Sequence, residues 1–433
     1  MWNQNQNKGM RKISLLVITV FFVGQLIGQE LTLSPYSRYG VGDILLSPSS
    51  RNIAMGGLGV AVDNHFSINP TNPASYGDAY FTTWDIAGFG QFSNLSTEDN
   101  KEDQFSAGFQ NIGFIFPSNS PFVLAMGFSP YSAVGYNIIA DTEIVQGGET
   151  LTSRIEYEGS GGLNQLYLGG AYKLLNGKLK LGAQANYIFG ITQYNRSASF
   201  VDNNLFTSGV TIDEEIFLAG ISGKAGIIFT DSLGSSGSMI RLGGLVDFNT
   251  SLSGDRRFVT GNIGFRDTLI DERGNANIPA RYGVGIHFAK VANYSVGVDF
   301  TYQNWENFES ISTSTSLGEE WKVALGGEWV PNFSSPKYHN RIAYRMGAYY
   351  RQSYITFNDE PVNDIGVTFG IGLPPGQSGT NQFNQSRLYS RFNFSFALGR
   401  RGNLNAQPLE ELYARLQIGI SLNDRWFIKR VVD

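Results

Sequence analysis

A chain of 433 residues without cysteine cannot form disulfides or thiolate metal sites, and its length allows two or three soluble domains or one large barrel. Only 16% of the residues are charged and the net charge is −5, which argues against a nucleic-acid binder with a basic patch. The 52 glycines and 13% aromatic residues suit many strands whose outward faces do not meet water.

The N-terminus has the order of features found in secretory signal peptides. Lys8, Arg11 and Lys12 precede an apolar run at residues 13–24, so we expect residues 1–28 to be a signal peptide that is removed after export. A membrane anchor is the alternative, although the run is short for a transmembrane helix. The rest of the chain has no apolar run of that length. The exported protein is therefore predicted to be either soluble or a barrel of the bacterial outer membrane.

Residues 29–78 differ from the rest of the exported chain, because they are rich in Gly, Pro, Ser and Asn and show no sustained alternation. From residue 79 to residue 433, apolar and polar residues alternate with the two-residue period of a β-strand. The predicted strands are residues 79–93, 104–117, 121–140, 163–175, 179–198, 216–231, 238–253, 278–290, 293–309, 320–331, 341–354, 364–372, 386–399 and 411–427.

One hairpin shows the pattern clearly. In YKLLNGKLKLGAQANY, Asn176 and Gly177 stand between two alternating runs, and both residues tolerate positive φ. The alternation alone does not say whether the apolar face meets a soluble core or lipid.

The connections between the predicted strands decide that question. Short links recur at every second position, namely 117–121, 176–177 and 290–293. Longer links stand between them, namely 141–162, 199–215 and 254–277. This order is typical of outer-membrane barrels, and an even number of strands places both chain ends in the periplasm.

The polar faces of the strands support the same conclusion. Arg345, Arg391 and Arg415 lie opposite apolar faces, which is costly in a soluble core and ordinary in a polar lumen. The predicted fold is therefore all-β: a 14-stranded antiparallel transmembrane β-barrel spanning residues 79–433. Aromatics near strand ends suit interfacial girdles, although each could also be an ordinary buried aromatic. These are Trp305, Trp321, Trp329, Trp426 and Phe427.

Short motifs between residues 278 and 375 follow one another in an order that resembles a known family. The stretch IPARYGVGIHFAKVANYSVGVDFTYQNWENF, residues 278–308, carries Pro279, Gly285, Asp299 and Trp305. It resembles the FadL family of outer-membrane transporters for hydrophobic compounds, the OmpP1/FadL/TodX type of Bacteroidetes. Residues 321–350 and 365–375 are similar to the following strands of that family.

The N-terminal segment is similar to the family's hatch, a plug inside the barrel. The similarity implies that residues 29–78 form such a hatch. Its expected key residues are Gly56, Gly57, Asn72, Pro73 and Ala74. The chain ends in NDRWFIKRVVD without a terminal aromatic residue, which departs from the usual assembly signal.

The resemblance also implies a function. Proteins of that family take up hydrophobic small molecules by diffusion; the ligand displaces the hatch and leaves sideways at a kink in the third strand. Here Ser129, Pro130 and Gly135 lie in the predicted third strand. Proline removes a ladder donor and glycine weakens a strand, so these residues predict either a lateral gate or the end of a shorter strand.

The arginines of the polar face have two possible roles. The inward set is Arg281, Arg345, Arg351, Arg387, Arg391 and Arg415, with Asp299 and Glu328 also inward. Arg345, Arg391 and Arg415 are candidates for binding a ligand carboxylate, because arginine pairs with carboxylates in a bidentate manner. The commoner role is a salt-bridge network that braces barrel and hatch.

We therefore expect an outer-membrane channel for fatty-acid-like molecules, with membrane lipid and a hydrophobic ligand as its partners. The alternative is an accessory barrel of a protein-secretion or barrel-assembly complex, whose partners are other outer-membrane proteins. An apolar pocket between hatch and wall favours uptake. A lumen blocked by salt bridges and long ordered loops favour docking. No enzyme, cofactor or metal is expected, because His65, His287 and His339 lack ligand spacing and no nucleophile motif accompanies them.

Overall fold

The structure is a computed structural model that describes eleven stretches of the chain. These are residues 30–45, 49–62, 65–118, 120–146, 149–201, 206–234, 237–262, 265–290, 293–311, 317–375 and 390–424. The predicted signal peptide, Arg387, Trp426 and Phe427 lie outside the described residues. Among the described residues, no helix is long and apolar enough to cross a membrane.

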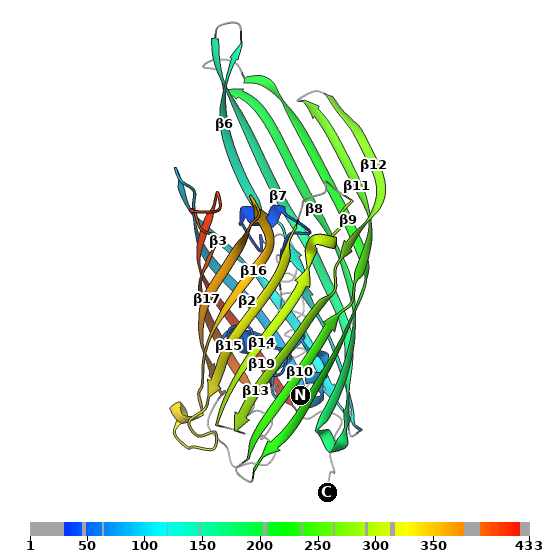
Figure 1. Cartoon of the computed structure of the whole chain (residues 1–433), viewed down its shortest axis with the longest axis vertical. Helices are drawn as coiled ribbons and strands as arrows, with labels where there is room; N and C mark the ends of the chain where they lie inside the picture. Colours follow the sequence, from blue (N-terminus) through cyan, green and yellow to red (C-terminus); the bar gives the residue numbers. More distant parts are fainter. Residues whose placement is uncertain are drawn as a thin grey trace, which may run out of the picture.

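The described chain forms a closed antiparallel barrel of 14 wall strands, which confirms the predicted fold (Figure 1). The first seven wall strands are β2 (Thr82–Ser96), β3 (Lys101–Pro117), β4 (Phe122–Pro130), β7 (Glu149–Leu174), β8 (Leu179–Val201), β9 (Phe206–Leu233) and β10 (Ser238–Asp247). The other seven are β13 (Arg281–Lys290), β14 (Tyr294–Asn304), β15 (Glu319–Trp329), β16 (Ala343–Phe357), β17 (Glu360–Leu373), β18 (Arg391–Arg401) and β19 (Glu410–Asp424). Pairing of β19 with β2 closes the barrel, so no wall edge is left between the first and last strands.

The predicted hairpin at Asn176 and Gly177 is present between β7 and β8. Leu175, Asn176 and Gly177 have φ values of 51°, 55° and 85°, and Leu174 pairs with Leu179 across the turn. The Asn-Gly pair thus adopts the left-handed conformation that its composition predicts.

The segments that the sequence assigned to long loops are mostly strand instead. β6 (Tyr136–Gln146) pairs with the first part of β7, while β11 (Thr250–Asn262) and β12 (Phe265–Ile278) continue β10 and β13. We call the paired residues 136–146, 149–159, 194–201, 206–219, 253–262 and 265–275 the protruding sheet. Figure 1 shows that this sheet rises beyond the rest of the barrel on one side only. The prediction was wrong here because these strands carry polar residues on a face that meets water, so their alternation is weak.

The two faces of the wall strands are assigned correctly by the sequence pattern. Ile418 is 48% exposed on the outer wall, whereas its neighbour Gln417 is 2% exposed in the lumen. Met346 is 64% exposed while Arg345 is 6% exposed. An apolar outer wall around a polar interior is the arrangement that a lipid environment requires.

Trp305 is an exception to the predicted aromatic girdle. It is 1% exposed and its ring stacks on Tyr354 with centroids 4.4 Å apart, in an internal apolar cluster that includes Tyr36. The alternative of an ordinary buried aromatic holds, because β14 ends at Asn304 and the chain then turns inward as η5 (Trp305–Asn307). Trp329, at the opposite end of the wall, is 54% exposed on the outer surface.

The described N-terminal residues, 30–45, 49–62 and 65–78, run through the barrel interior and contact the inner faces of the wall strands. Their elements are short: η2 (Pro35–Arg38), β1 (Asp43–Ile44), α2 (Ser50–Ile53) and η3 (Pro73–Asp78). Such short elements cannot be stable alone, so their positions depend on contacts with the wall. We call this segment the hatch.

Candidate functional site

A buried cluster at Asp78 joins the end of the hatch to two wall strands. The carboxylate of Asp78 accepts hydrogen bonds from Lys180 of β8 and from Arg241 of β10. The side chains of Asp78 and Arg241 are 0% and 1% exposed. Arg241 also donates from Nε to the carbonyl of Ala61, 3.0 Å away, so one guanidinium contacts the hatch at two places.

A second cluster holds the middle of the hatch. Glu328 of β15 accepts hydrogen bonds from hatch Arg51 at 2.9 and 3.1 Å and from wall Arg345 at 2.6 Å. Arg345 also donates to Oδ1 of Asn393, 2.8 Å away. Two guanidinium groups thus compensate one partly buried carboxylate, whose side chain is 16% exposed.

Residues 34–43 of the hatch are held by a third set of contacts. Arg401 of β18 pairs with hatch Asp43 at 2.8 Å, and Ser34 donates to Glu411 of β19, also at 2.8 Å. Tyr354 donates its hydroxyl to the carbonyl of Gly42, 2.9 Å away.

Asp299, which the sequence placed inward, binds the hatch backbone directly. Its Oδ2 accepts hydrogen bonds from the amides of Gly59 and Val60 at 2.6 and 2.8 Å. A wall carboxylate therefore satisfies consecutive backbone donors in a segment without regular secondary structure.

Inward-facing glycines let the hatch lie directly on the wall backbone. A Cβ on Gly326 would stand 2.4 Å from the carbonyl oxygen of Met55, and one on Gly347 would stand 2.3 Å from the amide nitrogen of Gly56. Gly56 itself has φ of +73° and faces Ala348, so side chains are excluded on both sides of the contact. No layer of side chains, and hence no wide passage, separates hatch from wall at this level.

The predicted hatch motif begins η3. The side chain of Asn72 accepts a hydrogen bond from the amide of Ala74 at 3.0 Å and donates to the carbonyl of Val60 at 2.6 Å. Pro73 and Ala74 lie against the wall at Gly182, where a Cβ would stand 2.2 Å from their backbone. Asn72 thus caps a helical turn and links two parts of the hatch.

The predicted gate residues lie at a break in the third wall strand. β4 ends at Pro130, and β5 (Ser132–Ala133) bends away to pair with β1 of the hatch before β6 begins at Tyr136. β3 pairs with β4 only along residues 112–117. In the described part of the chain, residues 101–111 of β3 pair with β2 but with no strand on their other side.

Hatch residues occupy the inner side of this break. A Cβ on Gly135 would stand 1.9 Å from the carbonyl oxygen of Thr32, and one on Gly108 of β3 would stand 2.1 Å from Cδ2 of Leu31. Ser129 accepts a hydrogen bond from Gln165 of β7 at 3.0 Å, so the end of β4 is bonded to the next wall strand. Glycine is needed at Gly108 and Gly135 because the hatch comes so close.

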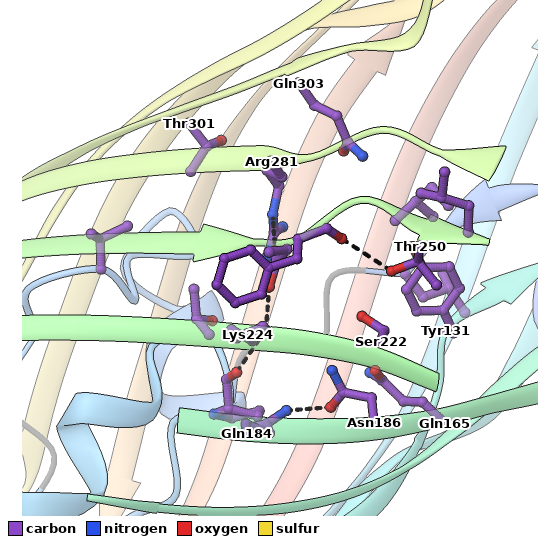
Figure 2. Close-up of a pocket in the computed structure, with 18 of the residues that line it drawn as sticks. Tyr131, Gln165, Gln184, Asn186, Ser222, Lys224, Thr250, Arg281, Thr301 and Gln303 are labelled. Carbon is purple, nitrogen blue, oxygen red and sulfur yellow. Dashed lines mark hydrogen bonds and ion pairs between the residues drawn. The ribbon is translucent and has the colours of Figure 1, made fainter. Parts of the chain in front are cut away.

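Two cavities remain between hatch and wall, and charged residues line both. The first holds about 130 Å³ and is shown in Figure 2; it is lined by Tyr131, Lys224, Asp247 and Arg281 among others. Asp247 pairs with Arg281 at 2.6 Å and with Lys224 at 3.3 Å. Neither the size nor the lining suits a long apolar ligand.

The second cavity holds about 190 Å³ and contains Arg351, Arg401, Arg415 and Glu411 in its lining. Lys322 lines both cavities, with its ammonium nitrogen 4.9 Å from the ring centroid of Tyr349.

The structure does not bring the three candidate carboxylate-binding arginines to one cavity. Arg345 is engaged by Glu328, and Arg391 lies over the ring of Phe333 at 5.3 Å. Only Arg415 lines a cavity, where it donates to Gln91 at 2.7 Å.

A salt-bridge network between barrel and hatch was predicted, with Arg345 and Glu328 among its inward residues, but four of its members were missed by the sequence analysis. Arg51 and Asp78 stand in a segment without periodicity, and Lys180 and Arg241 are lone charges on polar faces. The only available signal was that charge is scarce in this chain, so each charge in the hatch needs a partner inside the barrel.

The closed barrel of 14 wall strands, apolar outside and polar inside, defines the class of the protein as a transmembrane β-barrel. The sequence model of the BamG family matches residues 10–433, and the chain belongs to the BamG family. Among the curated proteins searched, none matches this chain.

Solved structures of this fold include a Pseudomonas aeruginosa FadL homologue, with a TM-score of 0.58 at 11% identity over 88% of this chain and 98% of that one. The CymD monoaromatic hydrocarbon channel has a TM-score of 0.55 at 14% identity over 89% of this chain and 99% of that one. The Ralstonia pickettii toluene transporter TbuX has a TM-score of 0.54 at 16% identity, over 88% of this chain and 99% of that one. At these identities the likeness describes the fold.

Proposed function

We propose that this protein is a non-transporting accessory barrel that binds other proteins within an outer-membrane protein-assembly or secretion complex. The observation that carries the proposal is how the hatch is held: a fully buried ion pair at Asp78 and partly buried ion pairs at Glu328 and Asp43 join it to opposite parts of the wall. Because the hatch lies directly on the wall backbone at Gly326 and Gly347, uptake through the lumen would require the hatch to move.

The energetic cost of displacement supports this view. Breaking a buried ion pair while leaving one charge unpaired costs ~3–5 kcal/mol. Moving the hatch would break at least the pairs of Asp78 and of Glu328, and a small apolar ligand in a charged cavity offers nothing to replace them. A braced hatch instead suits a rigid support.

The protruding sheet supplies a surface for such binding. Its strands β7, β8 and β9 are continuous with the wall and pair with β6 and β11, so they form a platform beyond the barrel mouth (Figure 1). The designation of the family, BamG, also favours a role beside other outer-membrane proteins.

The test compares complex formation with transport. The full-length protein is extracted from outer membranes in mild detergent and run on a native gel, and the purified barrel is placed in liposomes with a fluorescent fatty acid. We expect a discrete complex with defined stoichiometry and tracer uptake no faster than in protein-free liposomes. A monomer on the gel together with rapid tracer uptake would refute the proposal.

Uptake of hydrophobic small molecules remains the second candidate, and the break at Pro130 is the observation that favours it. Under this candidate Ser129, Pro130 and Gly135 form the lateral gate, and movement of Leu31 and Thr32 opens it. Pro130→Val restores a backbone donor and extends the ladder. It should therefore lower tracer uptake without lowering the folded yield, with Pro121→Val at the opposite end of β4 as the control.

A further inference from the structure

Around Tyr157, the face of the protruding sheet that looks toward the barrel axis is mainly apolar, whereas further along the same face Arg256 forms ion pairs with Glu214 and Glu272. Register places Ile138, Tyr157, Arg196 and Ile212 side by side on four adjacent strands. Tyr136, two residues from Ile138 and hence on the same face, is buried against the interior at 4% exposure. The further apolar members of this face are Ala140, Ile155, Ala198, Val210 and Phe258. We call these residues the inner face.

The opposite face of the same sheet is mainly polar. Its members are Asn137, Asp141, Arg154, Glu156, Glu158, Gln193, Asn195, Thr211, Asp213, Glu215, Asp255, Arg257, Arg266, Asp271 and Arg273. Around Tyr157 the sheet is therefore amphipathic, with its polar face outward, whereas along β9, β11 and β12 both faces carry charged residues. Figure 1 shows that the opposite rim of the barrel ends lower than this sheet. Val210 on this face is 52% exposed.

Two guanidinium groups stand at the centre of the inner face. Arg196 of β8 and Arg38 of the hatch lie on the ring of Tyr157, with their Cζ atoms 4.8 and 5.2 Å from its centroid. Both arginines are exposed, and within the described residues neither makes an ion pair. The tyrosine ring fixes the two cations next to each other without neutralising them.

Most other arginines of the protruding sheet are neutralised by carboxylates. Arg154 pairs with Asp141 at 2.9 Å, Arg256 with Glu214 at 2.6 Å, and Arg273 with Asp255 at 3.1 Å. A pair of uncompensated arginines on an apolar surface is thus a local departure from the charge balance of the sheet.

We infer that the inner face binds an extended acidic segment of a partner protein over the mouth of the barrel, an inference that rests on the proposed function. A carboxylate of the segment pairs with Arg38 and Arg196 around Tyr157. Apolar side chains beside that carboxylate cover Ile138, Ile155, Val210 and Ile212. Arginine and tyrosine surrounded by apolar side chains are the composition that concentrates binding energy at protein interfaces. The chemistry of the site therefore selects Asp or Glu flanked by aliphatic or aromatic residues.

The test uses photo-cross-linking in the full-length protein in cells. Benzoylphenylalanine is placed at Val210 on the inner face and, as the matched control, at Thr211 on the outer face of the same strand. We expect cross-linking from position 210 and little from position 211. Sequencing of the cross-linked peptide should show an acidic residue between apolar residues of another protein.

Charge reversal makes the test specific. Arg196→Glu should lower the cross-linking yield from position 210 by at least about tenfold, because it repels the carboxylate. Arg257→Glu, which makes the same charge change on the outer face, should leave the yield unchanged. Replacing the identified partner carboxylate by Arg should restore cross-linking to Arg196→Glu. If Arg196→Glu lowers the folded yield, Arg38→Gln replaces it as a milder variant.

The outcomes separate this inference from the proposed function. Equal cross-linking from positions 210 and 211, a cross-linked peptide from a second copy of this chain, or unchanged yield in Arg196→Glu overturns the inference even when the native complex is intact. Absence of any native complex from the unmodified protein instead overturns the proposed function.

Discussion

The lumen and the protruding sheet use charge in opposite ways. In the lumen, Asp78 is fully buried and shared by two cations from different strands, so its pairing links the hatch to the wall. In the protruding sheet, Arg273 and Asp255 form a pair whose side chains are 92% and 58% exposed. Buried pairs are strongly destabilising to break, whereas exposed pairs contribute little. The comparison indicates that charge positions the hatch, while continuity of the backbone ladder holds the sheet.

The largest expected effect is at Arg241. Arg241→Ala removes the guanidinium that pairs with the buried Asp78 carboxylate and the hydrogen bond to Ala61, so it should lower the free energy of unfolding by ~3–5 kcal/mol. Arg273→Ala in the protruding sheet should change it by less than ~1 kcal/mol. Unfolding in urea measures the free energy of unfolding of both variants. The folded fraction is read from the difference in gel mobility between the folded barrel and the heat-denatured chain. Similar effects for the two variants would remove the distinction between the regions.

A charge placed on either of two adjacent residues of β19 tests which face of the wall meets lipid. Ile418→Arg should cost ~2–4 kcal/mol in a lipid bilayer, because a guanidinium then faces hydrocarbon. Gln417→Arg on the adjacent inward position lines the second cavity and should cost much less. Equal folded yields of the two variants in liposomes would contradict the face assignment.

The contact of hatch with wall can be loosened without touching charge. A methyl group on Gly326 meets the carbonyl of Met55, so Gly326→Ala should displace the hatch and cost ~1–3 kcal/mol. Gly90→Ala, where a Cβ makes only ordinary contact with Phe105, is the control. Single-channel conductance should rise for Gly326→Ala alone; a closed pore in both variants would mean that other contacts suffice to hold the hatch.

The smallest expected effect is a pH response at the end of the protruding sheet. The hydrogen bonds from Arg154 hold the pKa of the Asp141 carboxyl below its usual range. A depressed folded-state pKa gives a contribution to stability that is present above the unfolded pKa and is lost as the pH falls through the folded value. The protection factors of the backbone amides of β6 against hydrogen exchange should therefore fall on acidification, relative to those of β18. Arg154→Ala should abolish that difference; if the acid response persists, another group is responsible.

Much of the barrel could be predicted from the sequence, because its determinants are local. Alternation identifies strands and faces wherever one face meets lipid, as at Gln417 and Ile418, and Asn176 with Gly177 forms a turn through its own backbone preferences. The end of β4 at Pro130 and the break that follows it agree with the missing N–H of proline. The same argument failed for residues 141–162, 199–215 and 254–277, where both faces tolerate polar residues and periodicity carries little information.

By itself, the sequence determined the number of wall strands, their inward and outward residues, and the order of short and long connections, because each depends on residues adjacent in the chain. Only the tertiary structure decided that Trp305 turns inward, that the long connections rise as one sheet, and that Asp78 meets Arg241. The last pair is separated by 163 residues. Such contacts depend on how the closed barrel and its hatch bring distant strands together, and barrel closure is a property of the whole set of strands, which no local pattern encodes.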